Sequence, residues 1–192
     1  MQTQSAMISM NELSNHDHSR FLTRTNHKVG RTNTLGPQAA EQGINKAVFR
    51  EGVVIQMTWT GAPTIYYGDE AGVCGFTDPD NRRTYPWGHE DQVLLAFHKD
   101  IIRLRRENEE LRSGSLKMLE SDYNFISYGR FNRKGQCAVL INNNNHPITK
   151  EIHVWEIGTP KTGKMKVILQ SRDDGYCMEG AEYEIKAGKI LI

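Results

Sequence analysis

The stretch Gly61-Ala62-Pro63-Thr64-Ile65-Tyr66-Tyr67-Gly68-Asp69-Glu70 decides how the rest of the chain is interpreted. Its centre, residues 64–67, has strong strand preference and lies between a Gly/Pro turn signal and a glycine that permits a sharp exit. A short apolar run with turn signals at both ends is typical of a buried strand in a parallel sheet. Asp69 and Glu70 follow at the end of this strand, where ligands bind in parallel α/β folds. The alternative is that they only cap or solvate a loop.

Upstream of this stretch the sequence predicts a short strand, a loop and a long helix. Residues 7–13 are expected to form the strand, and the polar residues 23–36 are expected to form the loop. An amphipathic helix of about five turns should begin at Pro37, which suits a first helical turn. Gly52 inside this helix marks either close packing or a kink. The helix should end near residues 59–61 and lead directly into the stretch of residues 61–70.

Residues 71–88 form a long loop that mixes carboxylates, paired arginines and aromatic residues. Loops of this length are usually functional or disordered, and Tyr85 and Trp87 argue against disorder. Aromatic faces beside polar groups suit sugar rings, whose apolar faces stack while their hydroxyls form hydrogen bonds. The alternative is that the arginines of the loop pair with its own aspartates and only hold it: Arg82 and Arg83 with Asp78 or Asp80.

Residues 90–112 give the clearest helical pattern, with one apolar stripe and a charged, solvated opposite face. The stripe consists of Leu94, Phe97, Ile101, Leu104 and Leu111. After the Ser-Gly pair that ends this helix, the composition changes to short apolar runs separated by turn residues. The runs are residues 116–119, 125–131, 137–141, 152–155, 167–169, 183–185 and 190–192. This pattern predicts an antiparallel β-sandwich, with residues 142–145 as a polar turn.

The bulk properties exclude several classes of function. The net charge of +1 gives no basic surface for nucleic acid or an anionic membrane, and no apolar run approaches the ~20 residues that span a bilayer. The three widely spaced cysteines argue against a disulfide framework and a zinc site. They favour a reducing compartment and hence a cytoplasmic location. The first ten residues lack the features of a signal peptide.

A cluster of polar and ionisable residues, Asn15, His16 and Asp17, follows the first predicted strand. Asp17 is a plausible N-cap for a short helical turn through residues 20–22, in which case the cluster is ordinary surface. The second interpretation is that these groups bind protons and hydroxyls.

Three motifs together resemble the α-amylase family, glycoside hydrolase family 13. Residues 15–17, Asn-His-Asp, are similar to the motif that follows the seventh barrel strand in this family. Residues 61–70 match its Gly-x-Pro-x-Ile-Tyr-Tyr-Gly-Asp-Glu motif on the eighth strand. Residues 78–87, Asp-Pro-Asp-x-Arg-Arg-x-x-Pro-Trp, resemble the neopullulanase, cyclomaltodextrinase and amylopullulanase-like branches. The motifs occur in the right order and spacing. The tail resembles the C-terminal β domain of this family, so the resemblance covers essentially the whole chain.

The resemblance implies an α/β part followed by an all-β part. Residues 1–112 are then the C-terminal end of a catalytic (β/α)8 TIM barrel, about strands seven and eight with their helices. Residues 113–192 are an antiparallel β-sandwich domain that is cut short at its end. Asp69 and Glu70 are expected to be rim residues rather than catalysts, because adjacent residues of a strand point to opposite faces.

The resemblance also implies roles for individual residues. Asp17 is expected to be the third catalytic carboxylate, which stabilises an oxocarbenium-like transition state, and His16 to hydrogen-bond the same sugar. A fixed carboxylate beside a ring that gains positive charge binds the transition state more strongly than the ground state. The further expected substrate-binding residues are Asn15, Arg83, Tyr85 and Trp87. The implied substrate is an α-glucan or maltooligosaccharide, cleaved with retention at α-1,4 bonds, with α-1,6 bonds as a second candidate.

Part of the family's catalytic machinery has no counterpart in these residues. Retaining chemistry needs a nucleophile and an acid/base about 5–5.5 Å apart, which the family takes from its fourth and fifth barrel strands. The chain alone is therefore expected to be inactive, with the true start of the protein upstream of Met1. No cofactor or metal is expected in this chain; the calcium that many family members hold is expected, where present, in the missing part of the parent. The alternative is a non-catalytic carbohydrate-binding or structural remnant, or a subunit completed by a separate N-terminal part; the oligomeric state stays open.

Overall fold

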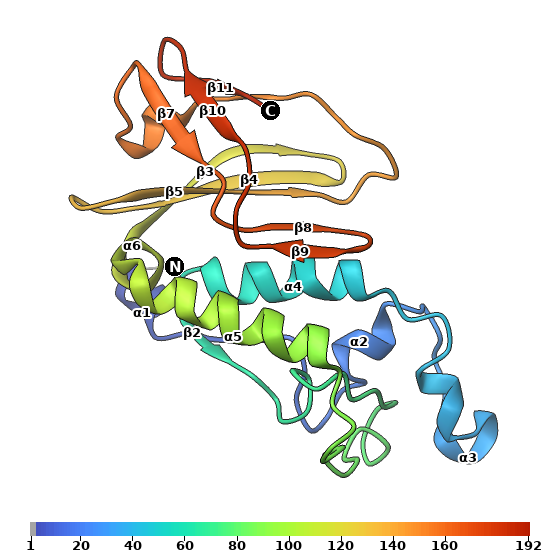
Figure 1. The fold of residues 1–192 in the computed structure, drawn as a ribbon. Coiled ribbons are helices and arrows are strands. Elements are labelled where there is room, and N and C mark those ends of the chain that lie inside the picture. Colours follow the sequence, from blue (N-terminus) through green and yellow to red (C-terminus); the bar gives the residue numbers. More distant parts are fainter. Residues whose placement is uncertain (1–2) are drawn as a thin grey trace.

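A computed structural model of the chain describes residues 3–192 and shows a mixed α/β arrangement (Figure 1). Met1, on which the expectation about the start of the protein depends, lies outside the described residues. The elements before the strand-rich half are α1 Thr3–Met7, β1 Met10–Glu12, α2 Phe21–Arg24, α3 Thr32–Leu35, η1 Pro37–Ala40, α4 Lys46–Thr58, β2 Ala62–Thr64, α5 Gln92–Glu107 and α6 Glu109–Ser113. None of these helices has the length and apolar character needed to cross a membrane.

The start of residues 61–70 forms a strand that pairs in parallel with the strand before the histidine–aspartate cluster. Strand β2 lies beside β1, with Met10 opposite Ala62. The parallel arrangement confirms the sequence-based prediction, but the extent and the burial of the strand were predicted wrongly. Strand β2 ends at Thr64, and both of its end residues are exposed because β1 is its single partner strand within residues 3–192. Asp69 and Glu70 consequently lie in a turn rather than directly at the end of a strand.

Helix α4 begins at Lys46, not at Pro37 as the sequence predicted. Pro37 opens the short 3-10 helix η1 instead. The side chain of Asn45 caps α4 by accepting hydrogen bonds from the amides of Ala47 and Val48, at 2.9 and 3.1 Å. This cap satisfies amides that a helix leaves unpaired, so it sets the start of the helix more strongly than the proline does. The predicted loop over residues 23–36 is likewise interrupted by helix α3.

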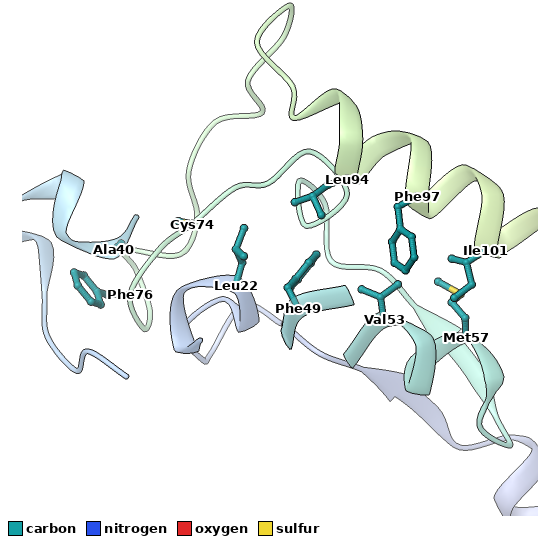
Figure 2. Packing of buried hydrophobic residues seen from close by; sticks show 10 residues of the cluster. All are labelled: Leu22, Ala40, Phe49, Val53, Met57, Cys74, Phe76, Leu94, Phe97 and Ile101. Atoms are coloured by element: carbon teal, nitrogen blue, oxygen red, sulfur yellow. The ribbon is translucent and has the colours of Figure 1, made fainter. Parts of the chain in front are cut away.

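Helices α4 and α5 enclose the main apolar core together with the loop after β2 (Figure 2). Its buried members are Leu22, Ala40, Phe49, Val53, Met57, Cys74, Phe76, Leu94, Phe97 and Ile101. The predicted stripe of residues 90–112 is confirmed, since all five of its members are buried, although Asn108 divides the helix into α5 and α6. Gly52 serves close packing, because a Cβ at this position would lie 2.5 Å from Cε1 of Phe21.

The second half consists of short antiparallel strands and one 3-10 helix. These are β3 Ser115–Asp122, β4 Phe125–Phe131, β5 Gln136–Asn142, β6 Glu151–Ile152, η2 Val154–Ile157, β7 Gly163–Lys166, β8 Gln170–Arg172, β9 Gly175–Cys177, β10 Glu182–Ile185 and β11 Ile190–Leu191. They form the sheet β3-β4-β5 and the pairs β10-β7, β11-β6 and β8-β9. The prediction of a strand over 152–155 was wrong beyond Ile152, because Val154 opens η2, and residues 167–169 join β7 to β8. Past β11, Ile192 exchanges backbone hydrogen bonds with Lys150.

The hairpin β8–β9 folds back onto the helices rather than onto the other strands (Figure 1). Leu169 and Tyr176 pack against the core between α4 and α5. The hydroxyl of Tyr176 donates a hydrogen bond to Oδ2 of Asp100 on α5 at 2.8 Å. On α4, Nε of Arg50 donates to Oγ of Ser171 at 2.9 Å. The hairpin therefore contributes to the core between α4 and α5, while a second apolar cluster among the strands is formed by Phe125, Ile152, Val154, Ile185 and Ile190.

Replacing Glu51 with glutamine is expected to stabilise the chain at pH 8 by about 1 kcal/mol and to change little at pH 4.5. Burial, with a smaller contribution from Asp173 in the β8–β9 turn, raises the pKa of Glu51 to about 7. The folded state therefore binds more protons than the unfolded state between about pH 4.5 and 7, and stability falls as the pH rises through this window. The effect stays small because Glu51 is half-buried and water screens its charge.

The measurement is the urea midpoint as a function of pH, with Glu107→Gln as a control, since Glu107 is exposed on α5. A Glu51→Gln effect of equal size at both pH values would contradict this assignment.

Candidate functional site

The segment Asn15-His16-Asp17 lies in the loop between β1 and α2. Oδ1 of Asn15 accepts hydrogen bonds from the backbone amides of Asp17 and His18 at 2.9 and 3.2 Å. Asn15 thus closes a local turn of the kind that asparagine favours. The alternative in which Asp17 caps the following helix is wrong, because α2 begins at Phe21 and has no side-chain cap.

The side chains of His16 and Asp17 form an exposed pair. Nε2 of His16 lies 3.4 Å from Oδ1 of Asp17, and the two side chains are 61% and 65% exposed. An ionised carboxylate can accept several hydrogen bonds, and an imidazole can donate or accept. The pair therefore offers its polar atoms to a hydroxyl-rich ligand that approaches from solvent. The amide of Asn15, by contrast, is engaged within the chain, because Nδ2 donates to Oε1 of Glu12 at 2.6 Å.

Residues 75–81 hold this exposed segment in place. The backbone carbonyl of Asp17 accepts hydrogen bonds from Oγ1 of Thr77 at 2.7 Å and from the amide of Asp78 at 3.3 Å. The amide of Arg20 donates to the carbonyl of Gly75 at 2.9 Å. The segment is thus tied to a loop that lies some sixty residues away in the sequence.

Arg20 is the fully buried residue that anchors the segment, and the sequence contains no local signal for this role. Its Nη1 donates to Oδ1 of Asp69 at 2.9 Å and to the carbonyl of Tyr67 at 2.7 Å. Its Nε donates to the carbonyl of Asn81 at 2.9 Å. The guanidinium also lies over the rings of Tyr66 and Tyr67, at 4.4 and 4.8 Å from their centroids. Residues 61–70 therefore supply Arg20 with a carboxylate, a carbonyl group and two aromatic rings.

Asp69 is a structural partner of Arg20, only 4% exposed. Burial raises the pKa of Asp69 to about 6, although hydrogen bonds from Ser14 and Arg20 act in the opposite direction. Removing a carboxylate from water outweighs its pairing with one cation here, which is common for buried ion pairs. A carboxylate so enclosed cannot reach a large substrate.

Arg83, Tyr85 and Trp87 make their contacts elsewhere on the long loop. Arg83 donates to Oε1 of Glu41 at 2.9 Å and to the carbonyl of Pro37 at 2.6 Å, which ties the loop to η1. The rings of Tyr85 and Trp87 lie 4.4 Å apart, and Trp87 is 79% exposed. The structure therefore brings Asn15, His16 and Asp17 together, and it adds a separate aromatic pair in which Trp87 is exposed and Tyr85 is half-buried.

Of the two loop arginines, Arg82 pairs with an aspartate of its own loop, as the alternative interpretation predicted. Nε of Arg82 lies 2.5 Å from Oδ1 of Asp78. Asp80 instead accepts a hydrogen bond from the amide of Thr32 at 2.8 Å. Within residues 3–192, no three His, Cys, Asp or Glu side chains gather in a way that could hold a metal ion.

Comparison with known proteins gives the first evidence from outside the chain. The family described as alpha amylase, catalytic domain, matches residues 1–96. Neopullulanase 2 of Thermoactinomyces vulgaris is 35% identical over 98% of this chain and 28% of its own length. An amylopullulanase of Thermoanaerobacter thermohydrosulfuricus is 32% identical over 96% of this chain and 12% of its own length.

Solved structures share the fold over nearly the whole chain. An Anoxybacillus α-amylase superposes with a TM-score of 0.74 at 24% identity, covering 97% of this chain and 35% of that one. A cyclomaltodextrinase superposes with a TM-score of 0.67 at 26% identity, covering 98% of this chain and 30% of its own. The chain thus spans about a third or less of the relatives it matches. With the family matched over half of its residues, this chain belongs to the α-amylase family.

Proposed function

We propose that these residues are part of a glycoside hydrolase that cleaves α-glucans with retention, in which Asp17 stabilises the transition state. The observation that carries this proposal is the exposed His16–Asp17 pair, held from below by buried groups. As the glycosidic bond breaks, positive charge develops on the sugar ring. A carboxylate that is already fixed in position stabilises this charge without reorganising during the reaction.

The other site residues would bind the substrate. His16 would hydrogen-bond the sugar that Asp17 contacts, and Tyr85 and Trp87 would stack against apolar sugar faces. Asn15 and Arg83, both engaged in internal hydrogen bonds, would act mainly by holding the two loops. The proposed substrate is an α-glucan or maltooligosaccharide, with α-1,4 bonds as the first candidate and α-1,6 bonds as the second.

We also propose that residues 1–112 are the C-terminal end of a catalytic (β/α)8 barrel and that residues 113–192 are a β-sandwich domain. The unit β1-α4-β2, two parallel strands joined through a helix, supports the first part. Active sites of such barrels lie at the C-terminal ends of the strands. The histidine–aspartate segment follows β1, and the long loop with its aromatic pair follows β2.

The purified 192-residue chain is expected to show no turnover of maltotriose or pullulan, because it contains no counterpart of the nucleophile and acid/base. The measurement is the release of reducing ends. Turnover that disappears in Asp17→Asn would contradict this prediction. Sugar binding without turnover would favour the alternative of a non-catalytic carbohydrate-binding protein.

Asp17 itself is tested in a longer reading frame. If the genomic sequence upstream of Met1 continues in frame through an Arg-x-Asp segment, Asp17→Asn in the resulting protein should lower kcat by about 10²–10³-fold. Asp174→Asn is the matched control, since Asp174 is also an exposed aspartate but lies in the β8–β9 turn, and it should leave kcat unchanged. Full activity of Asp17→Asn would remove the proposed role.

A further inference from the structure

We propose that Asn81 is a positioning residue for Asp17: its side-chain amide fixes the backbone of residues 15–18. The inference rests on the role proposed above for Asp17, because the position of this carboxylate matters only if it meets the substrate. Asn81 lies in the loop after β2 and is fully buried, so it cannot touch a substrate itself.

The side chain of Asn81 bridges the two ends of the site segment. Its Nδ2 donates to the carbonyl of Asn15 at 3.2 Å and to the carbonyl of His18 at 2.6 Å. His16 and Asp17 lie between these two attachment points. Both partners are carbonyl oxygens, which only accept, so the nitrogen of the amide must face them.

Within residues 3–192, the oxygen of the same side-chain amide adds no hydrogen bond, so the two donated bonds alone hold Asn81 in this orientation. Its Oδ1 is buried and has no hydrogen-bond partner among the described residues. An unbonded buried oxygen is unfavourable, so the two donated hydrogen bonds must outweigh this cost. A position that only filled space would be better occupied by an apolar side chain.

Asn81 is itself bonded to the buried ion pair of Arg20 and Asp69. Its backbone carbonyl accepts a hydrogen bond from Nε of Arg20 at 2.9 Å, and Arg20 is held by Asp69. The loop also closes tightly, because a Cβ on Gly75 would lie 2.7 Å from Cα of Asn81. Through these hydrogen bonds, Asn81 links the buried ion pair to the two carbonyl groups that flank the His16–Asp17 pair.

The test compares Asn81→Ala, Asn81→Ser and a matched control, Asn26→Ala, in the 192-residue chain. Asn26 also donates from Nδ2 to backbone carbonyls, those of Ala39, Ala40 and Gln42, but in a different loop. The readout is amide hydrogen exchange of Asp17 and His18 by NMR, with thermal midpoints measured in parallel. Exchange at both amides should rise about 10- to 100-fold in Asn81→Ala. It should rise less in Asn81→Ser, whose hydroxyl can donate one bond, and not at all in Asn26→Ala.

Three results would overturn the proposal: unchanged exchange at Asp17 and His18 in both Asn81 variants, an equal rise in Asn26→Ala, or a rise spread evenly over the chain. The exchange readout does not depend on catalysis. Full hydrolysis by an Asp17→Asn variant of the longer protein would end the proposed function and leave the exchange result standing. In that longer protein, Asn81→Ser should lower kcat about tenfold while KM stays within about twofold, the pattern of a displaced transition-state contact.

Discussion

Replacing Arg130 with methionine is expected to lower the free energy of unfolding by about 3–5 kcal/mol. Arg130, on β4, is fully buried. Its Nη1 donates to the carbonyl of Thr58 at 2.5 Å and its Nη2 to the carbonyl of Gly114 at 2.9 Å. These carbonyls lie at the C-terminal ends of α4 and α6, where a helix leaves its acceptors unpaired. Methionine fills a similar volume but donates no hydrogen bond, so both carbonyls would stay buried without a partner.

The loss should be this large because Arg130 joins elements from both halves of the chain. Tyr128, two residues earlier on the same strand, also reaches α4, with its hydroxyl 2.7 Å from Oγ1 of Thr58. Burial lowers the pKa of Arg130, with a further lowering from the neighbouring Arg105. Within residues 3–192, the guanidinium is held by these two carbonyl groups, and no carboxylate lies within salt-bridge distance of it.

Urea unfolding followed by circular dichroism at pH 7 measures this effect. Arg130→Lys should fall between the wild type and Arg130→Met, because an ammonium group can bind one of the carbonyls but lacks the fork of the guanidinium. Arg133→Met is the control, since Arg133 is exposed in the turn after β4. A loss below about 1 kcal/mol in Arg130→Met would show that water molecules form hydrogen bonds with the two carbonyl groups in place of the guanidinium.

The sequence predicted the elements whose pattern is local and strong. The stripe of residues 90–112 repeats with the period of a helix, and β4 has the bounds predicted for it, Phe125–Phe131. The start of α4 was missed because two local signals competed: Pro37 suits a first turn, but Asn45 forms the cap. The hairpin β8–β9 was missed because it is short and polar, and its one aromatic side chain, the partly buried Tyr176, packs on the core between the helices.

The exposed part of the candidate site could be proposed from the sequence, whereas its buried support could not. The motifs of residues 15–17 and 61–70 can be recognised from the types and order of their residues. Arg20 and Asn81 act through backbone carbonyls and a carboxylate that are 47 to 66 residues distant in the sequence. A buried arginine has no local pattern, because its partners are defined only once the two loops meet.

Replacing Arg20 with methionine is expected to cost about 3–5 kcal/mol, since it leaves the carboxylate of Asp69 buried without its cation. The variant also loses the hydrogen bonds to the carbonyls of Tyr67 and Asn81, so the loop after β2 loses its anchor. Urea unfolding at pH 7 measures the loss. Lys164→Met is the control, because its ion pair with Glu182 is exposed and should leave the midpoint unchanged.

A double-mutant cycle and its pH dependence separate the ion pair from simple loss of packing. Arg20→Met combined with Asp69→Leu removes both charges, so it should be less destabilised than the sum of the two single variants by at least about 1 kcal/mol. Without Arg20, the pKa of Asp69 rises above its present value of about 6. The folded variant then holds its proton to higher pH than the folded wild type, so its deficit must widen as the pH rises from 6 to 8. A deficit that stays constant over this range would mean that Asp69 does not depend on Arg20 for its charge, and the anchor would have to be assigned to the carbonyls and rings alone.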